Sequence, residues 1–128
     1  MTAAVRKRPK HLDLMKIRLP LPGIVSILHR ISGALLFLLV IPCGLAALDA
    51  SLASAEGYAG WGQTLSNPVV KLIAIGFAWA YLHHFCAGIR YLLLDIHQGI
   101  DLPAARQSSQ IVLGVSLLLT LLMAVKLW

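Results

Sequence analysis

Charged residues are scarce in this chain. Only 12% of its 128 residues are charged, whereas 59% are hydrophobic. An ordinary soluble domain carries about 25% charged and about 45–50% apolar residues. A soluble domain of this length could not bury so much apolar surface, so we expect a lipid bilayer to cover the rest. The length also limits the chain to one domain at most.

Cysteine is almost absent, since only Cys43 and Cys86 occur. They fall in two predicted membrane spans at depths that differ by more than about 10 Å, which excludes a disulfide. Neither has the spacing of a metal site, and we expect both to be small apolar core residues. The chain also lacks a cysteine series and a glycine-rich dinucleotide fingerprint, so we expect it to bind neither an iron–sulphur cluster nor a flavin.

Acidic residues are few as well, with five Asp and Glu against eleven Lys and Arg, for a net charge of +6. Six of the basic residues lie between Arg6 and Arg18, ahead of the first long apolar run. This placement is typical of a cytoplasmic flank under the positive-inside rule. No basic stripe interleaved with aromatic residues follows, so we do not expect nucleic-acid binding.

Three long apolar blocks follow the basic segment, from about Ile24 to Leu52, Val69 to Leu94 and Ile111 to Trp128. Each can cross a hydrocarbon core of about 30 Å, which needs roughly 20 helical residues. A spanning segment must satisfy its own backbone hydrogen bonds, so these spans must be helices. We therefore predict an all-α membrane protein. It has a cytoplasmic N-terminal segment at 1–23 and a transmembrane domain at 24–128, with three helices at about 24–52, 69–94 and 107–128.

Prolines and capping residues punctuate these blocks. Asn67 and Pro68 predict the start of the second helix, because proline is tolerated in a first turn. Pro103 is expected to separate the second helix from the third. Pro42 lies inside the first span and should kink it. Ser26 could cap the first helix.

The loops between the blocks differ in charge. The first loop, from Ala50 to Asn67, has no Lys or Arg, whereas the second, from Asp95 to Gln110, contains Arg106. The positive-inside rule places the N-terminus and the second loop in the cytoplasm, and the first loop and the C-terminus outside. Lys71 and Lys126 oppose this orientation, but both lie near span ends, where a lysine can snorkel.

One face of the second predicted helix carries a histidine among small residues. Ionisable residues inside a membrane mark function by default, and a flat ligand could approach this face closely, so we interpret His84 first as a haem ligand. A histidine that only hydrogen-bonds across a helix interface, on a stripe suited to bare helix packing, stays open as an alternative. The residues that share this face at helical spacing are Gly76, Ala80, His84, Gly88, Tyr91 and Asp95.

Other polar residues have simpler interpretations. His83 lies about 100° round the helix from His84, so we expect it to pack rather than to reach the same iron. We interpret Arg90 as an interfacial anchor, and Asp95 as a helix-end residue or the partner of Arg90. At the cytoplasmic start of the first helix, His29 and Arg30 lie at a depth similar to that of His84, where a cation could neutralise haem propionates.

Three motifs together resemble one family. They are R-P-K-H-L-D-L at Arg8 to Leu14, S-I-L-H-R-I-S-G at Ser26 to Gly33, and H-x-x-x-G-I-R at His84 to Arg90, followed by Asp95. Their order, the chain length and the three spans are similar to the cytochrome b membrane-anchor subunits of succinate dehydrogenase (succinate–ubiquinone oxidoreductase). The resemblance covers nearly the whole chain. One departure is His97, where the family often has a small residue.

The resemblance implies roles for individual residues. His84 matches the axial ligand of a haem b whose other ligand comes from a second hydrophobic anchor subunit, which completes the helical bundle. His29 and Arg30 match residues near the haem propionates, and Ser26, Ile27 and Arg30 match residues of the ubiquinone site. In that site Ser26 would donate a hydrogen bond to a quinone carbonyl, Ile27 would contact the ring, and Arg30 would stabilise the charge of the reduced quinone.

The resemblance also implies a complex in a bacterial inner membrane. A flavoprotein subunit and an iron–sulphur subunit would oxidise succinate, while this chain anchors them and takes part in electron transfer to ubiquinone without being the catalytic head. Two alternatives stay open. The chain could anchor a quinol:fumarate reductase, which runs the reaction backwards, or it could be a structural anchor without haem.

Overall fold

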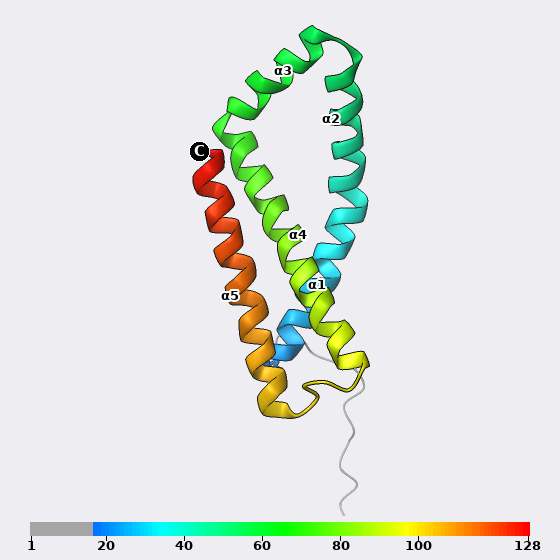
Figure 1. Cartoon of the computed structure of the whole chain (residues 1–128), viewed down its shortest axis with the longest axis vertical. Coiled ribbons are helices and arrows are strands. Elements are labelled where there is room, and N and C mark those ends of the chain that lie inside the picture. Colours follow the sequence, from blue (N-terminus) through cyan, green and yellow to red (C-terminus); the bar gives the residue numbers. More distant parts are fainter. Residues whose placement is uncertain (1–16) are drawn as a thin grey trace, which may run out of the picture.

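The computed structural model describes residues 17–128, and this part of the chain contains helices and no strands (Figure 1). Three helical stretches, Leu21–Ala53, Pro68–Asp95 and Leu102–Leu127, are long and apolar enough to cross a membrane. The predicted all-α membrane architecture with three spans is therefore confirmed. The elements in chain order are α1 (Leu21–Leu35), the π-helical turn η1 (Leu36–Val40), α2 (Ile41–Ala53), α3 (Ala55–Ser66), α4 (Pro68–Asp95) and α5 (Leu102–Leu127).

Two helices begin earlier than the sequence suggests. Helix α1 starts at Leu21 instead of residue 24, and α5 starts at Leu102 instead of about residue 107. Both carry a proline in the first turn, where the missing N–H has no intrahelical acceptor to satisfy. The expectation that Pro103 separates the second and third spans was wrong, since this residue opens the third span.

The first span is interrupted in its middle. The turn η1 has π-helical hydrogen bonding and ends immediately before α2, which has Pro42 in its first turn. A proline inside a helix lacks a donor and crowds the carbonyl four residues earlier, and a π turn is one way to accommodate this. Pro42 therefore breaks the regular α-helix, as predicted.

The connection between the first two spans is itself mostly helical, whereas the sequence suggested a loop over Ala50 to Asn67. Helix α3 bridges the ends of α2 and α4 (Figure 1). Ser54 caps it by accepting a hydrogen bond from the Gly57 amide at 2.9 Å, and Asn67 caps α4 by accepting one from the Val69 amide at 2.9 Å. Such caps satisfy amides that a helix start leaves unpaired.

Helix packing is concentrated in α1, α4 and α5. Helices α4 and α5 lie side by side along their length, and α1 packs against both near one end (Figure 1). The apolar core is small and contains Val25, Ala87 and Val112. Serine and threonine hydroxyls on the buried face of α5 bond to carbonyls of the same helix, which suits close packing in a membrane.

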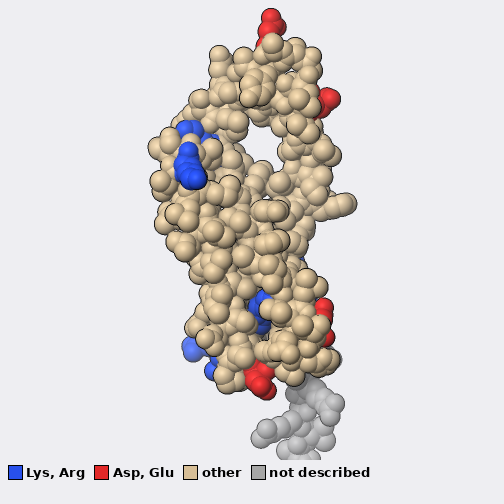
Figure 2. Space-filling view, viewed as in Figure 1, with Lys and Arg blue, Asp and Glu red and all other residues tan. Residues whose placement is uncertain are grey.

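Charged side chains are separated along the visible face of the molecule. Figure 2 shows the Lys and Arg side chains in two groups, one at the lower end and one higher up but below the top, with an uncharged belt between them. This distribution is what a bilayer-spanning bundle requires, because a charge at the bilayer centre is costly.

Candidate functional site

The packing of α1 against α4 brings two predicted site residues together. The imidazole of His29, from α1, stacks on that of His84, from α4, with ring centroids 4.1 Å apart and planes 5° from parallel. The Tyr91 ring, two turns further along α4, lies 5.0 Å from the His29 ring. The site therefore forms where His29 and His84, which the sequence predicted at similar depth, meet, and aromatic stacking holds both rings.

One nitrogen of His84 is held by the backbone of α1. Its Nδ1 lies 3.0 Å from the His29 carbonyl oxygen and 3.2 Å from the Ser32 hydroxyl, which itself donates to that carbonyl at 2.9 Å. A carbonyl can only accept, so Nδ1 carries the proton and Nε2 presents a lone pair. Metal-ligating histidines usually show this arrangement, with the second nitrogen bonded to a carbonyl or carboxylate.

Glycine makes this close approach possible. A Cβ placed on Gly33 would lie 2.8 Å from Cε1 of His84, which is too close for a side chain there. On the opposite helix a Cβ on Gly88 would lie 3.8 Å from Nε2 of His29, which is an ordinary contact. The small-residue face of α4 is only partly used within this chain, because Ala80 is buried whereas Gly76 is exposed.

The predicted quinone residues lie on the same helix as His29. Ser26 and Ile27 are half-buried, and Arg30 is exposed. Ser26 is the sixth residue of α1, so the expectation that it could cap the helix was wrong. Within residues 17–128, neither the Ser26 hydroxyl nor the Arg30 guanidinium has a side-chain hydrogen bond or an ion pair.

His83 behaves as a packing residue, as its angular position predicts. It is fully buried and stacks against Trp79, one turn earlier, with ring centroids 5.4 Å apart. Neither of its ring nitrogens has a hydrogen-bond partner among the described residues. An imidazole enclosed by its own chain in this way is not presented to a ligand.

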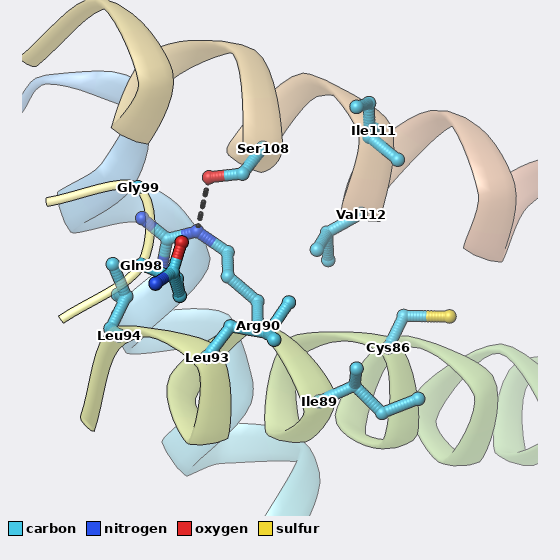
Figure 3. Close-up of a pocket in the computed structure, with 10 residues that line it drawn as sticks. All are labelled: Cys86, Ile89, Arg90, Leu93, Leu94, Gln98, Gly99, Ser108, Ile111 and Val112. Carbon is cyan, nitrogen blue, oxygen red and sulfur yellow. Dashed lines mark hydrogen bonds between the residues drawn. The ribbon is translucent and has the colours of Figure 1, made fainter. Parts of the chain in front are cut away.

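Arg90 is not the interfacial anchor that the sequence suggested. Its side chain is only 6% exposed, and its Nε donates to the Ser108 hydroxyl at 2.9 Å (Figure 3). A second contact joins its Nη2 to the Ala105 carbonyl at 3.4 Å. Arg90 thus ties α4 to α5, and no ion pair joins it to Asp95, which is exposed, in the part of the chain that the structure describes.

The sequence analysis did not identify two serines that hold functional side chains in place. Ser32 orients His84, and Ser108 holds Arg90, yet a serine in an apolar helix carries no distinctive signal of its own. For Ser32 one signal existed, because it lies six residues after Ser26 in the motif that supplied His29 and Arg30. Ser108 follows no motif, and only the packing of α5 on α4 reveals its role.

Comparison with known proteins identifies the family of this chain. Residues 4–123 match the family model described as "Succinate dehydrogenase/Fumarate reductase transmembrane subunit". A protein named succinate dehydrogenase cytochrome b556 subunit from Coxiella burnetii is 39% identical over 123 residues, which are 95% of this chain and 98% of that protein. Proteins of the same name from Paracoccus denitrificans and Rickettsia prowazekii are 32% and 30% identical, over 90% and 91% of this chain and 88% and 90% of their own lengths. The chain belongs to the family of succinate dehydrogenase/fumarate reductase transmembrane subunits.

Proposed function

We propose that this chain is the haem b-containing membrane anchor of a succinate dehydrogenase, with His84 as an axial ligand of the haem iron. The observation that carries the proposal is the hydrogen bond from His84 Nδ1 to the His29 carbonyl, because it leaves Nε2 free to bind iron. The chain is a subunit of an oxidoreductase complex, and relatives named cytochrome b556 subunits support haem b as its cofactor.

The residues present fit this cofactor. Gly33 and Gly88 remove side-chain bulk beside the stacked imidazoles, and the His29 carbonyl fixes the tautomer of His84. The cations nearest to the ligand along α1 are His29, when protonated, and Arg30, which would neutralise the haem propionates. When bound, haem b supplies a one-electron redox centre. We assign its other axial ligand to the partner anchor subunit, because His83 is enclosed and offers no second site.

The ubiquinone site belongs to the opening turns of α1. Ser26 and Arg30 are four residues apart and so share one face of the helix. The Ser26 hydroxyl would donate a hydrogen bond to a quinone carbonyl, and Ile27 would contact the ring. The Arg30 guanidinium would stabilise the negative charge that develops on the quinone oxygen during reduction, which is the role of a positioned cation at a developing oxyanion.

The orientation in the membrane follows from the charge at the two ends. The start of α1 and the turn between α4 and α5 lie at the same end of the molecule (Figure 1). We place this end, with the N-terminal segment 1–23, in the cytoplasm and the C-terminus in the periplasm of a bacterial inner membrane. Most of that segment lies outside the described residues. The iron–sulphur and flavoprotein subunits would dock at this end, close to the quinone site.

A difference spectrum of the purified complex tests the assignment. We expect a b-type spectrum after dithionite reduction, and full or partial reduction of the same haem when succinate is the donor. The absence of any haem would leave a structural anchor as the function. Faster fumarate reduction by quinol than succinate oxidation by quinone would instead favour a quinol:fumarate reductase.

Ser26→Ala tests the quinone site, because it removes a hydrogen-bond donor without a change of charge. We expect succinate-driven quinone reduction to fall by about tenfold, as is typical for loss of one hydrogen bond at a site of developing charge. Succinate oxidation with a dye that accepts electrons before the membrane should persist, and haem content should stay normal. Unchanged quinone reductase activity would place the quinone elsewhere.

A further inference from the structure

A second site lies on the side of α4 that faces away from His84. Ile89 and Leu93 follow His84 by five and nine residues, which places them about 140° and 180° from it around the helix. With Ile111 and Val112 of α5 they line a groove of about 320 Å³ between the two helices (Figure 3). No predicted haem or quinone residue lines it, so the groove is separate from the site between α1 and α4.

Nearly all of the accessible lining of the groove is apolar, but one end contains the mostly buried cation Arg90 and polar neighbours. Figure 3 shows the Arg90 guanidinium beside Gln98, Gly99 and Ser108, whereas Cys86, Ile89, Ile111 and Val112 form the apolar remainder. The guanidinium carries five N–H donors, of which its two contacts to α5 use those on Nε and Nη2. No carboxylate lies within ion-pair distance of it among residues 17–128. The guanidinium also lies over the Tyr91 ring, 5.3 Å from its centroid. A counter-charge would stabilise this buried cation further, so this end of the groove suits an anion.

The groove opens to the lipid and begins at head-group depth. The side chains of Ile89, Leu93 and Ile111 are 46%, 48% and 56% exposed, so the apolar wall is accessible from outside the bundle. Arg90 lies five residues before the end of α4, which is about 7.5 Å along the helix axis. From there the apolar wall continues toward the middle of the span at Cys86. The groove therefore presents a charge at the level of phosphates and an apolar surface at the level of acyl chains.

We infer that this groove binds one anionic phospholipid of the leaflet that faces the α4–α5 turn. Its phosphodiester bonds to Arg90, with Gln98 beside it, and one acyl chain lies between Ile89 and Ile111. Basic pockets between transmembrane helices are suited to such head groups, and the volume is that of an ordinary ligand pocket. An acidic side chain of a partner helix and free phosphate are the competing occupants, and each gives a different experimental result.

Native mass spectrometry of the purified whole complex tests the inference. The complex is exchanged into detergent containing phosphatidylcholine with or without phosphatidylglycerol, and retained lipid is counted. We expect one retained phosphatidylglycerol that Arg90→Gln lowers by about tenfold or more, because a charged hydrogen bond is lost. Arg106→Gln removes an exposed arginine near the same end and is the matched control, which should keep the lipid.

A second pair of variants keeps the test decisive if Arg90→Gln does not assemble. Ile111→Trp fills the groove without touching Arg90 and should also expel the lipid, whereas Leu118→Trp, on an equally exposed position of α5 outside the groove, should not. Equal retention in the wild type, Arg90→Gln and Ile111→Trp would overturn the inference, as would no retention in the wild type. Displacement of the lipid by millimolar inorganic phosphate would also overturn the inference. So would the finding that a partner carboxylate, and no lipid, occupies the position beside Arg90.

Discussion

The two halves of the first span are equally apolar but pack very differently. Helix α1 lies against α4 and α5 and buries Val25 and Ser32, whereas α2 has no buried residue and contacts neither α4 nor α5. Figure 2 shows an opening through the molecule beside this second half. The half that packs contains serine, histidine and glycine, and the half that does not is mostly aliphatic. In a membrane, small and polar residues specify helix contacts, since apolar side chains gain nothing over lipid.

The comparison fits a division of labour along one span. The α1 half contacts the proposed haem ligand His84 through Gly33, His29 and Ser32. The span is exposed from the turn η1 onward. Phe37 and Leu38 of η1 are 70% and 65% exposed, and Leu52 of α2 is 75% exposed. A surface of this kind is suited to contact with lipid or with the partner anchor subunit that we propose. The following predictions test whether the difference between the two halves is real.

The largest effect is expected at the packed half. His84→Ala should abolish haem binding, because it removes the imidazole that we propose binds the haem iron through Nε2. His83→Ala is the matched control and should retain haem, since His83 is enclosed within the bundle. Haem content per complex is the measurement. The reverse result would show that the ligand assignment is wrong, and equal loss in both variants would indicate misfolding.

Because α2 is exposed, we expect the stability of the chain to depend on its partner subunit. Expressed alone, it should not yield a stable monomer with one haem, because α2 contacts neither α4 nor α5 and the second axial ligand that we propose is missing. Co-expression with the partner anchor subunit should restore both. Size-exclusion chromatography with a haem assay measures the difference. A stable monomer loaded with stoichiometric haem would contradict the prediction.

Two glycines allow a direct comparison of the halves. Gly33→Ala places a methyl group 2.8 Å from His84 and should lower stability by about 1–3 kcal/mol, the usual cost of overpacking, and perturb the haem spectrum. Gly44→Ala in α2 meets nothing within 4 Å and should change neither property in this chain. Thermal unfolding of the complex, followed at the haem band, measures both. A tolerated Gly33→Ala would mean that the site is looser than its geometry indicates.

The smallest effect concerns the turn at the packed end. His97 has φ of 62° and closes α4, with its amide bonded to the Leu94 carbonyl and that of Gln98 bonded to the Leu93 carbonyl. This is the Schellman arrangement, in which glycine avoids the strain of a left-handed residue. His97→Gly should raise stability by about 0.5 kcal/mol, after the greater chain entropy of glycine is subtracted. Gln98→Gly relieves no left-handed strain and should therefore lower stability. Thermal unfolding of the two variants measures the difference.

Sequence reasoning predicted most of the fold and the centre of the site. The spans follow from apolar length alone, and His29 and His84 were expected at similar depth because each lies near the same end of its helix. Helix α3 was missed because this short segment, with several alanines and glycines, shows only weak helical periodicity of its apolar residues. Cys43 was expected in a core but is exposed, since a single sequence does not show which half of a span lacks a neighbour.

The buried position of Arg90 was missed for a related reason. A charge near a span end is normally expected to reach water, and nothing in the sequence announces that Ser108 of another helix will accept its hydrogen bond. Only the side-by-side packing of α4 and α5 brings the two together.

The π-helical turn at Leu36–Val40 sets the rotational phase of the first span. Each hydrogen-bonded loop of a π-helix contains one residue more than in an α-helix, so residues above the turn do not continue the stripes that run below it. The face of Ser26, Arg30 and Gly33 therefore has no straight extension into α2. Deletion of one residue within the turn would rotate α2 by about 100° relative to α1. The surface offered to the partner subunit would then turn away, while the histidine pair below stayed in place.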